Sequence, residues 1–298
     1  MKITLTGSLG NITKPLAIEL INNGHEVTII SSQSARQSEI ERLGAIAAIG
    51  SISDVTFLTS TFKNSDAVYT MVPPSYASND PIAYNHEQGK VYSSAIAQAG
   101  VKKVVNLSSW GADNPEGCGP VTGLYFVEQE LNKLQSQGCL ITHLRPGYFY
   151  TNLLHSIGLI KSAGIIGMNY AAETELVLVH PRDIAAVAAK ALVDQDVRSD
   201  KNFRYIGSDE AALQEVTTTI GEAIGKPELP YIQFSDEDTL RGYLQLGINE
   251  GMAISLVQLG KATREGKMIA GYLQNRPTQM GQTKLADFAK EFAEVYQF

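Results

Sequence analysis

The first half of the chain alternates short apolar runs with longer segments whose apolar residues recur at helical spacing. The runs predict strands, and the segments between them predict helices. The segment 12–24, for example, repeats apolar residues at Leu16, Leu20 and Ile21 and ends on a glycine. The predicted strands are KITLTG (2–7), EVTIIS (26–31), AIAAIG (45–50), DAVYTMV (66–72), KKVVNLSS (102–109) and LITHLRPG (140–147). The predicted helices between them cover residues 12–24, 34–43, 84–99 and 124–138.

The second half has a less regular pattern. The stretch TELVLVHPRDIAAVAAKALVD (174–194) predicts a strand followed by a helix, and NFRYIGS (202–208) predicts another strand. Residues 211–225, 236–247 and 283–296 have helical patterns. We expect these later elements to form a smaller lobe beside the first half.

Strands that are apolar throughout and separated by helices indicate a parallel sheet covered on both faces. Right-handed crossovers then produce a doubly wound sheet of the Rossmann type. We therefore predict an α/β protein, a doubly wound parallel sheet with a smaller α+β C-terminal substrate lobe. Residues 1–150 would form the nucleotide-binding domain, with 176–194 returning to it, and residues 151–298 would mainly form the substrate lobe.

Composition narrows the class of protein. The chain has 298 residues, 44% hydrophobic and 18% charged, as in an ordinary globular protein. Its net charge of -7 disfavours nucleic acid as a partner. No apolar run is long enough to cross a membrane, no secretory leader is recognised, and the two cysteines form no CxxC. We expect a soluble cytoplasmic protein with a small-molecule substrate and no membrane partner, and we allow for a homodimer.

The turn between the first predicted strand and helix has the spacing of a phosphate-binding turn. Gly7 and Gly10 would let the backbone come close to a pyrophosphate, and the helix N-terminus would offer free N–H donors. Thr13 stands where a third glycine usually allows close helix–strand packing. We expect Thr13 to push the helix outward slightly and to leave the donors in place. The alternative is a plain structural turn.

The end of the second predicted strand selects the cofactor. NAD enzymes place an acidic residue there to bind the ribose hydroxyls, but this chain reads IISSQSARQ. Ser31, Ser32 and Arg36 could instead contact a 2′-phosphate, whereas Glu26 lies at the far end of the strand. We therefore favour NADP(H) over NAD(H); the alternative is that Arg36 is a solvated residue of the next helix.

Four stretches carry a family resemblance: GSLGNIT, LSSWGA, LITHLRPGYFYTNLL and VHPRDIAAVAAKAL. In this order they resemble the NmrA-like branch of atypical short-chain dehydrogenases/reductases, over nearly the whole chain. That branch includes quinone reductases, dye reductases, aryl-ether reductases and non-catalytic redox sensors. The resemblance implies pyrophosphate contacts from Gly7, Ser8, Leu9, Gly10, Asn11 and Ile12. It implies further cofactor contacts from Val72, Pro73, Ser108, Pro146, Gly147, Tyr148 and Phe149.

Ordinary short-chain reductases use a serine, a tyrosine and a lysine, the last two spaced Tyr-x-x-x-Lys. The lysine is needed because a tyrosine with a pKa near ~10 is a poor acid or base at neutral pH. Ser109 and Tyr125 are the candidates by position, but Gln129 stands four residues after Tyr125. Lys133, the only lysine of that helix, is expected to be a solvated surface residue. Tyrosine-assisted carbonyl reduction is therefore disfavoured.

Aromatic residues follow the fifth and sixth predicted strands, on the expected cofactor side. A pocket lined by aromatic side chains could hold a conjugated acceptor, and the alternative is that these are ordinary core aromatics. Candidate substrate contacts are Trp110, Tyr125, Tyr148, Tyr150, Asn152 and His155. The histidines show no metal-ligand spacing, so no metal is expected.

Two hypotheses follow. The first is an NADP(H)-dependent oxidoreductase that transfers hydride to a quinone-like or other conjugated acceptor without a Tyr-x-x-x-Lys pair. Such a hydride transfer mainly requires that the cofactor and the acceptor are held close together and correctly oriented. The second is a non-catalytic NADP(H)-binding redox sensor that acts through a protein partner.

Overall fold

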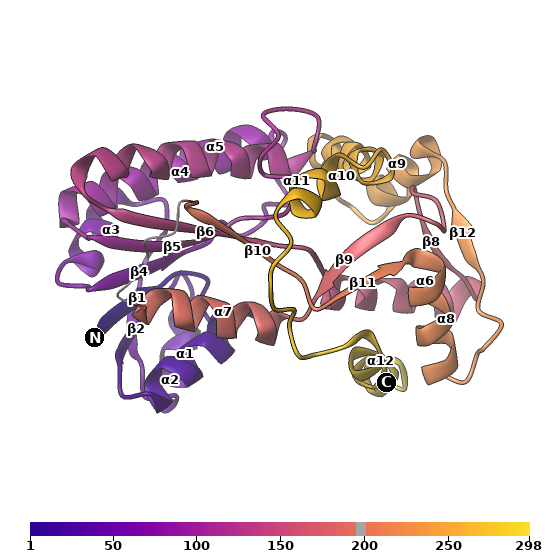
Figure 1. The fold of residues 1–298 in the computed structure, drawn as a ribbon, viewed down its shortest axis with the longest axis horizontal. Helices are drawn as coiled ribbons and strands as arrows, with labels where there is room; N and C mark the ends of the chain where they lie inside the picture. Colours follow the sequence, from indigo (N-terminus) through magenta and orange to yellow (C-terminus); the bar gives the residue numbers. More distant parts are fainter. Residues whose placement is uncertain (195–200) are drawn as a thin grey trace.

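The structure is a computed structural model that describes residues 1–194 and 201–298. A parallel sheet with helices on both faces occupies one side of the molecule, and a second lobe lies beside it (Figure 1). The main sheet has seven strands in the order β10-β6-β5-β4-β1-β2-β3. Every neighbouring pair in it is parallel. The strands are β1 (Lys2–Leu5), β2 (Glu26–Ser31), β3 (Ile46–Ile49), β4 (Ala67–Thr70), β5 (Lys103–Leu107), β6 (Leu140–Pro146) and β10 (Phe203–Ile206).

Two helical layers cover this sheet. On one face, three helices pack their apolar sides on β1 and its neighbours: α1 (Thr13–Asn22), α7 (Pro181–Val193) and α2 (Gln37–Arg42). The short 3-10 helix η1 (Ser34–Arg36) precedes α2. The other face is covered by α3 (Val55–Phe62), α4 (Pro81–Ala99) and α5 (Pro120–Asn132). The predicted doubly wound parallel fold is thus confirmed, as are its first six strands.

Helix α3 was not predicted. Its sequence VTFLTSTF is rich in β-branched residues, which lower helix propensity. The Asp54 side chain caps it by accepting hydrogen bonds from the amides of Thr56 and Phe57. Burial of Leu58 and Phe62 under the sheet supplies the rest of its stability.

The second lobe contains two small sheets. In one, β9 (Glu175–Val179) pairs in parallel with β7 (Tyr148–Phe149) and antiparallel with β11 (Asp209–Ala212). In the other, β8 (Ile166–Met168) pairs with β12 (Tyr231–Gln233). The helical elements are η2 (Lys133–Gln137), which extends α5, and, in the lobe, η3 (Tyr150–Ser156), α6 (Ile157–Ala163), α8 (Leu213–Ala223), α9 (Asp236–Gln245), α10 (Glu250–Arg264), α11 (Lys267–Gln274) and α12 (Leu285–Tyr296).

The segment 176–194 divides between the two sheets. Strand β9 belongs to the small sheet of the second lobe, whereas α7 packs on α1 and the main sheet. Strand β10 lies within the segment expected mainly in the second lobe, yet it forms an edge of the main sheet.

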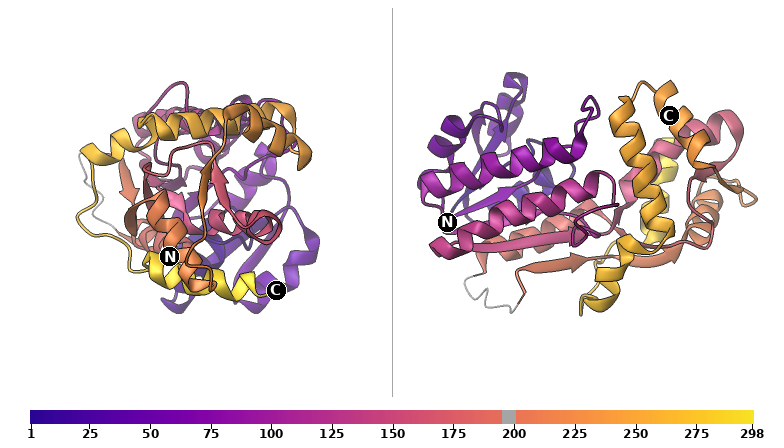
Figure 2. Two further views of the ribbon diagram at one scale, coloured as in Figure 1. Left: turned by 90° about the vertical axis from the view of Figure 1, so that its right-hand side faces the viewer. Right: turned by 90° about the horizontal axis from the view of Figure 1, so that it is seen from above.

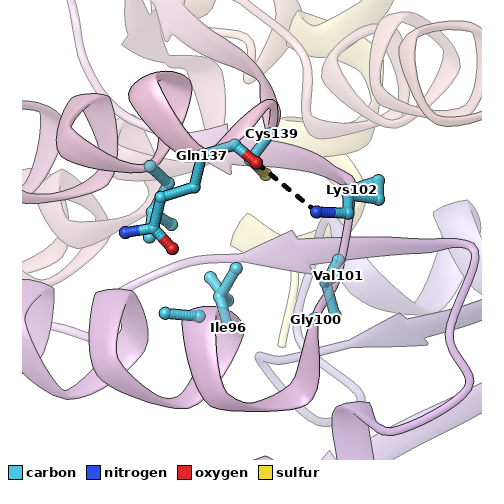
Figure 3. Close-up of a pocket in the computed structure, with 8 residues that line it drawn as sticks. Ile96, Gly100, Val101, Lys102, Gln137 and Cys139 are labelled. Carbon is cyan, nitrogen blue, oxygen red and sulfur yellow. Dashed lines mark hydrogen bonds between the residues drawn. The ribbon is translucent and has the colours of Figure 1, made fainter.

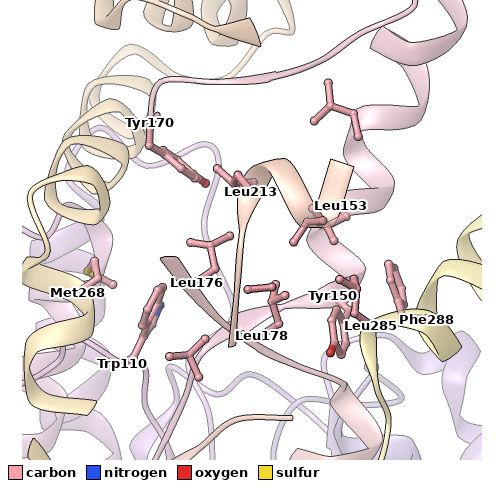
Figure 4. Close-up of a cluster of buried hydrophobic side chains, with 14 of the residues drawn as sticks. Trp110, Tyr150, Leu153, Tyr170, Leu176, Leu178, Leu213, Met268, Leu285 and Phe288 are labelled. Atoms are coloured by element: carbon pink, nitrogen blue, oxygen red, sulfur yellow. The ribbon is translucent and has the colours of Figure 1, made fainter. Parts of the chain in front are cut away.

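The second lobe lies against the carboxyl end of the main sheet. The chain runs from β6 directly into β7, and Trp110, just beyond β5, belongs to the lobe's own core. That core gathers Trp110, Tyr150, Leu176, Phe288 and their neighbours around β9 (Figure 4). Viewed from above, α10 runs across the ends of α4 and α5 (Figure 2). The lobe therefore covers the edge at which a doubly wound sheet binds ligands.

Candidate functional site

A pocket of about 230 Å³ lies between the turn after β1 and the loop after β2. Its lining brings together residues from two parts of the chain, and seven of these were predicted cofactor contacts. The lining residues are Gly7, Ser8, Leu9, Gly10, Ser31, Ser32, Gln33 and Arg36. Gln33 was missed by sequence reasoning, although its place between Ser32 and Arg36 could have indicated it.

The turn itself is shaped by Gly7 and Ser8. Gly7 has φ +93° and a Cβ there would lie 2.5 Å from the Thr13 hydroxyl oxygen, so only glycine fits without a shift. Ser8 also has positive φ, and its amide donates to the Ile30 carbonyl at 3.1 Å. The Ser8 hydroxyl donates to the Ser31 hydroxyl at 3.0 Å. These bonds fix the turn against the end of β2.

Thr13 is accommodated at the junction of α1 and β1. Its side chain is buried, and its hydroxyl donates to the Thr6 carbonyl at 3.0 Å. The space that it needs is the space left by the missing Cβ of Gly7. The threonine thus provides a hydrogen bond between helix and strand where a third glycine would provide only a close approach.

The N-terminus of α1 offers hydrogen-bond donors. Its N-cap, Ile12, makes no side-chain capping bond, and the first turn carries no acidic residue. Among the described residues, the amides of Leu9, Asn11 and Ile12 have no hydrogen-bond partner. Unpaired amides and the positive end of a helix dipole favour an anion such as a pyrophosphate. The residues present therefore fit a dinucleotide at this turn.

The loop after β2 provides the polar end of the pocket. Ser31 is buried, and its hydroxyl also accepts a hydrogen bond from the Gln33 amide at 3.2 Å, so its role is to hold the loop. Ser32 and Arg36 are exposed at the pocket. Arg36 and Lys14 both contact the carboxylate of Glu39, at 3.4 and 3.1 Å. Two cations thus gather here around one acid.

The remaining predicted cofactor residues follow the carboxyl ends of β4, β5 and β6. Val72, Pro73, Tyr148 and Phe149 are half-buried. Pro146 and Gly147 are buried, and a Cβ on Gly147 would lie 2.1 Å from the Val177 carbonyl oxygen. Gly147 is therefore required for the close approach of β9, whatever it contacts besides.

Ser108 is held by a buried ion pair. Its hydroxyl donates to Glu128 at 2.6 Å, and Glu128 receives two hydrogen bonds from Arg145, at 2.9 and 2.6 Å. The two parallel hydrogen bonds from Arg145 fix the position of the carboxylate. Because the Ser108 proton is directed at that carboxylate, the Ser108 oxygen can accept a hydrogen bond from a ligand but cannot donate one.

The catalytic candidates Ser109 and Tyr125 are half-buried. Tyr125 meets Phe126 edge-on, with ring centroids 5.3 Å apart. Lys133 lies on the surface, where it pairs with Glu130 at 2.6 Å. Among the described residues, no hydrogen bond or cation–π contact joins a lysine to Tyr125, so the Tyr–Lys arrangement of ordinary short-chain reductases is not formed here.

The predicted substrate contacts separate into two groups. Tyr150 is fully buried: its hydroxyl donates to Asp209 at 3.0 Å and its ring stacks on Phe288 at 5.1 Å. Trp110 is also buried, near Met268 (Figure 4). Both side chains lie in the core of the second lobe, which matches the alternative of ordinary core aromatics. The sequence could not show this, because their burial depends on where the second lobe packs.

The other substrate candidates keep some exposure. Asn152 is half-buried and His155 is exposed, both on η3. Tyr148 is half-buried, and burial, followed by the nearby Tyr243 hydroxyl, raises its pKa. Its phenol therefore stays protonated at neutral pH and could donate a hydrogen bond to a ligand, but it is not a base.

A second cavity lies at the amino-terminal ends of β5 and β6, beside Cys139 and Gln137 (Figure 3). Its volume of about 20 Å³ suits roughly one water molecule. Burial raises the pKa of both thiols, Cys118 and Cys139, to about 11, so neither is a reactive thiolate at neutral pH. Within the described ranges no three His, Cys, Asp or Glu side chains gather as metal ligands. The same ranges contain no helix with the length and apolarity to span a membrane.

Comparison with known proteins gives one family and many similar folds. The model of the NmrA-like family matches residues 1–288. An Escherichia coli NADPH-dependent quinone oxidoreductase, solved with NADPH, is 18% identical with a TM-score of 0.79 over 97% of this chain and 99% of its own. A Citrobacter triphenylmethane reductase, solved with NADP(H), is 18% identical with a TM-score of 0.76 over 97% and 99%. A Stenotrophomonas UDP-glucose 4-epimerase with bound NAD is 15% identical, with a TM-score of 0.68 over 100% and 98%. No curated protein matches the sequence.

Proposed function

The chain belongs to the NmrA-like family, and from this premise we propose that it is an NADP(H)-dependent oxidoreductase. In this proposal it passes hydride to a quinone-like or other conjugated small-molecule acceptor. The observation that carries the proposal is the pocket shared by the Gly7–Gly10 turn and the loop that ends at Arg36. It combines unpaired amides for a pyrophosphate with a cation for a further phosphate.

The preference for NADP(H) rests on the loop after β2. NAD-binding sites have an acidic residue there that accepts hydrogen bonds from the ribose hydroxyls, whereas this chain has Ser31 and Ser32, and Arg36 lines the pocket. A guanidinium binds phosphate through paired N–H groups. The fold alone does not decide between NADP(H) and NAD(H), because proteins of similar fold were solved with NADPH and with NAD.

The bound nicotinamide would supply the hydride. The chain's own residues would hold the cofactor at the amides of Leu9, Asn11 and Ile12 and orient its far end near Ser108 and Tyr148. No side chain among those described here forms a Tyr–Lys acid, so the reduced acceptor must be an anion stable enough to take its proton from water. A quinone meets that requirement, whereas a simple ketone does not.

Replacement of Gly10 tests this function. Gly10 has an ordinary φ and lines the pocket, and a Cβ there would lie 3.1 Å from the Gly7 carbonyl oxygen, a tight contact that a small shift of the turn relieves. A Gly10→Leu chain should therefore fold and place its side chain where the pyrophosphate would lie, and its folding is checked by circular dichroism. We expect the wild-type protein to oxidise NADPH in the presence of 1,4-benzoquinone and the variant to lose at least about 100-fold in kcat/KM, since the amides are then covered. The matched control is Gly158→Leu in α6, where a Cβ meets nothing within 4 Å.

A second candidate function is a sensor that binds NADP(H) without turnover. Two observations favour it. Gln129, not a lysine, stands four residues after Tyr125, and the Ser108 hydroxyl already donates its hydrogen bond to Glu128. Tight NADPH binding by the wild-type chain without oxidation by any quinone in a panel would support the sensor over the reductase.

A further inference from the structure

Three charged side chains from three elements meet beside the cofactor pocket. Lys14 of α1 places its Nζ 3.1 Å from one carboxylate oxygen of Glu39, and Arg36 of η1 places a guanidinium nitrogen 3.4 Å from the other. The side chains of Lys14 and Arg36 are each 44% exposed, and that of Glu39 is 35% exposed. Only Arg36 was foreseen from the sequence.

We propose that Lys14 joins Arg36 in binding the cofactor's 2′-phosphate, and that Glu39 limits how strongly the site prefers NADPH over NADH. This inference rests on the proposed function, because it assigns the specificity of the same pocket.

The cluster has the geometry of an anion-binding site in which the chain's own Glu39 carboxylate takes the place of a bound anion. Two cations contact the two oxygens of one carboxylate, which is how two cations hold a phosphate. A 2′-phosphate carries more charge than a carboxylate, about -1.5 to -2 at neutral pH. It also presents three terminal oxygens, enough for both cations.

The charge of Glu39 opposes that phosphate. The hydrogen bond from Lys14 is the main cause that lowers the pKa of Glu39, so this residue is ionised at neutral pH. Lys14, Arg36 and Glu39 then sum to a single positive charge, where the two cations alone would provide two. When NADH is bound, Glu39 pairs with both cations and offsets one of their two charges. When NADPH is bound, it competes with the phosphate for them.

Removal of the charge on Glu39 is the direct test. We expect Glu39→Gln to bind NADPH about 3- to 10-fold more tightly, an effect that falls with added salt because the groups are exposed. Its affinity for NADH should stay within about twofold of the wild type. The matched control is Glu41→Gln on the same helix, whose carboxylate accepts a hydrogen bond from Gln37. Calorimetric titrations of the full chain with NADPH and with NADH measure both affinities.

Removal of Lys14 should have the opposite effect on the affinity for NADPH. Lys14→Ala should weaken NADPH binding about fivefold and leave NADH binding unchanged. Arg42→Ala serves as its control, because Arg42 donates a hydrogen bond to the Ser38 carbonyl of its own helix and does not line the pocket.

The outcomes separate the two proposals. If the wild type binds neither cofactor, the proposed function is wrong. If the wild type binds NADPH but Glu39→Gln binds it no more tightly than Glu41→Gln, the function stands and the role of Glu39 is refuted. If Lys14→Ala binds NADPH as tightly as Arg42→Ala, the role of Lys14 is refuted in the same way.

Discussion

Thr13 and Gly7 show how two residues together shape the turn. A threonine at the third position of the turn is larger than the usual glycine, yet its hydroxyl donates a hydrogen bond to the Thr6 carbonyl in the space beside Gly7. The sequence shows that Thr13 stands in place of the third glycine, but it does not show that Gly7 leaves room for the Thr13 side chain. That relation exists only between a helix and a strand already packed together.

Substitution at Thr13 should therefore affect folding more than binding. In Thr13→Val the buried Thr6 carbonyl loses its hydroxyl partner, and we expect a loss of about 1–3 kcal/mol in the free energy of unfolding. Thr13→Ser, which keeps the hydroxyl, should lose less. Urea denaturation measures both. Equal stability of the valine variant and the wild type would show that the hydrogen bond has no net worth.

The strands and long helices of the main sheet were predictable because each carries a periodic pattern of its own. The first six strands, α1, α4, α5 and α7 follow that pattern. The elements missed are those whose stability comes from neighbours. Strand β7 has only two residues and forms through its pairing with β9. Helices α10 and α11 come after the predicted helix 236–247, and their sequences carry no clear apolar period or boundary that predicts two further helices.

Strand β6 carries a buried histidine, His143, that should make the free energy of unfolding depend on pH. His143 accepts a hydrogen bond from Asn106 at Nδ1 and donates from Nε2 to Asn132, which requires the neutral ring. Burial lowers its pKa below the ordinary value of about 6.5. The unfolded chain then binds more protons as pH falls below about 6.5, so the stability present at higher pH is lost on acidification.

We expect the free energy of unfolding to fall between pH 7.5 and pH 5.5, by up to about 1.4 kcal/mol per pH unit from this one group. A His143→Gln variant, with no titratable ring, should show a smaller fall, whatever its stability at pH 7.5. Urea titrations at the two pH values provide the comparison. An identical fall in both proteins would exclude His143 as a source of the pH dependence.

The molecule as a whole places a second lobe over the carboxyl edge of a doubly wound sheet (Figure 1). The phosphate turn was predictable, because its glycines, strand and helix are contiguous in sequence. The cluster of Lys14, Arg36 and Glu39 was not, since Lys14 and Glu39 are 25 residues apart and meet only when α1 and α2 share a face of the sheet. The same limit applies to Trp110 and Tyr150, whose burial depends on where the second lobe packs.

We propose that the pocket beside the Gly7–Gly10 turn binds NADP(H). The most direct test is a parallel calorimetric titration of the wild-type chain with NADPH and with NADH at low salt. We expect one site per chain and at least about tenfold tighter binding of NADPH than of NADH, because Arg36 and Lys14 contact only the charged 2′-phosphate. Equal or tighter binding of NADH would contradict the assigned cofactor, and no binding of either would contradict the assigned site.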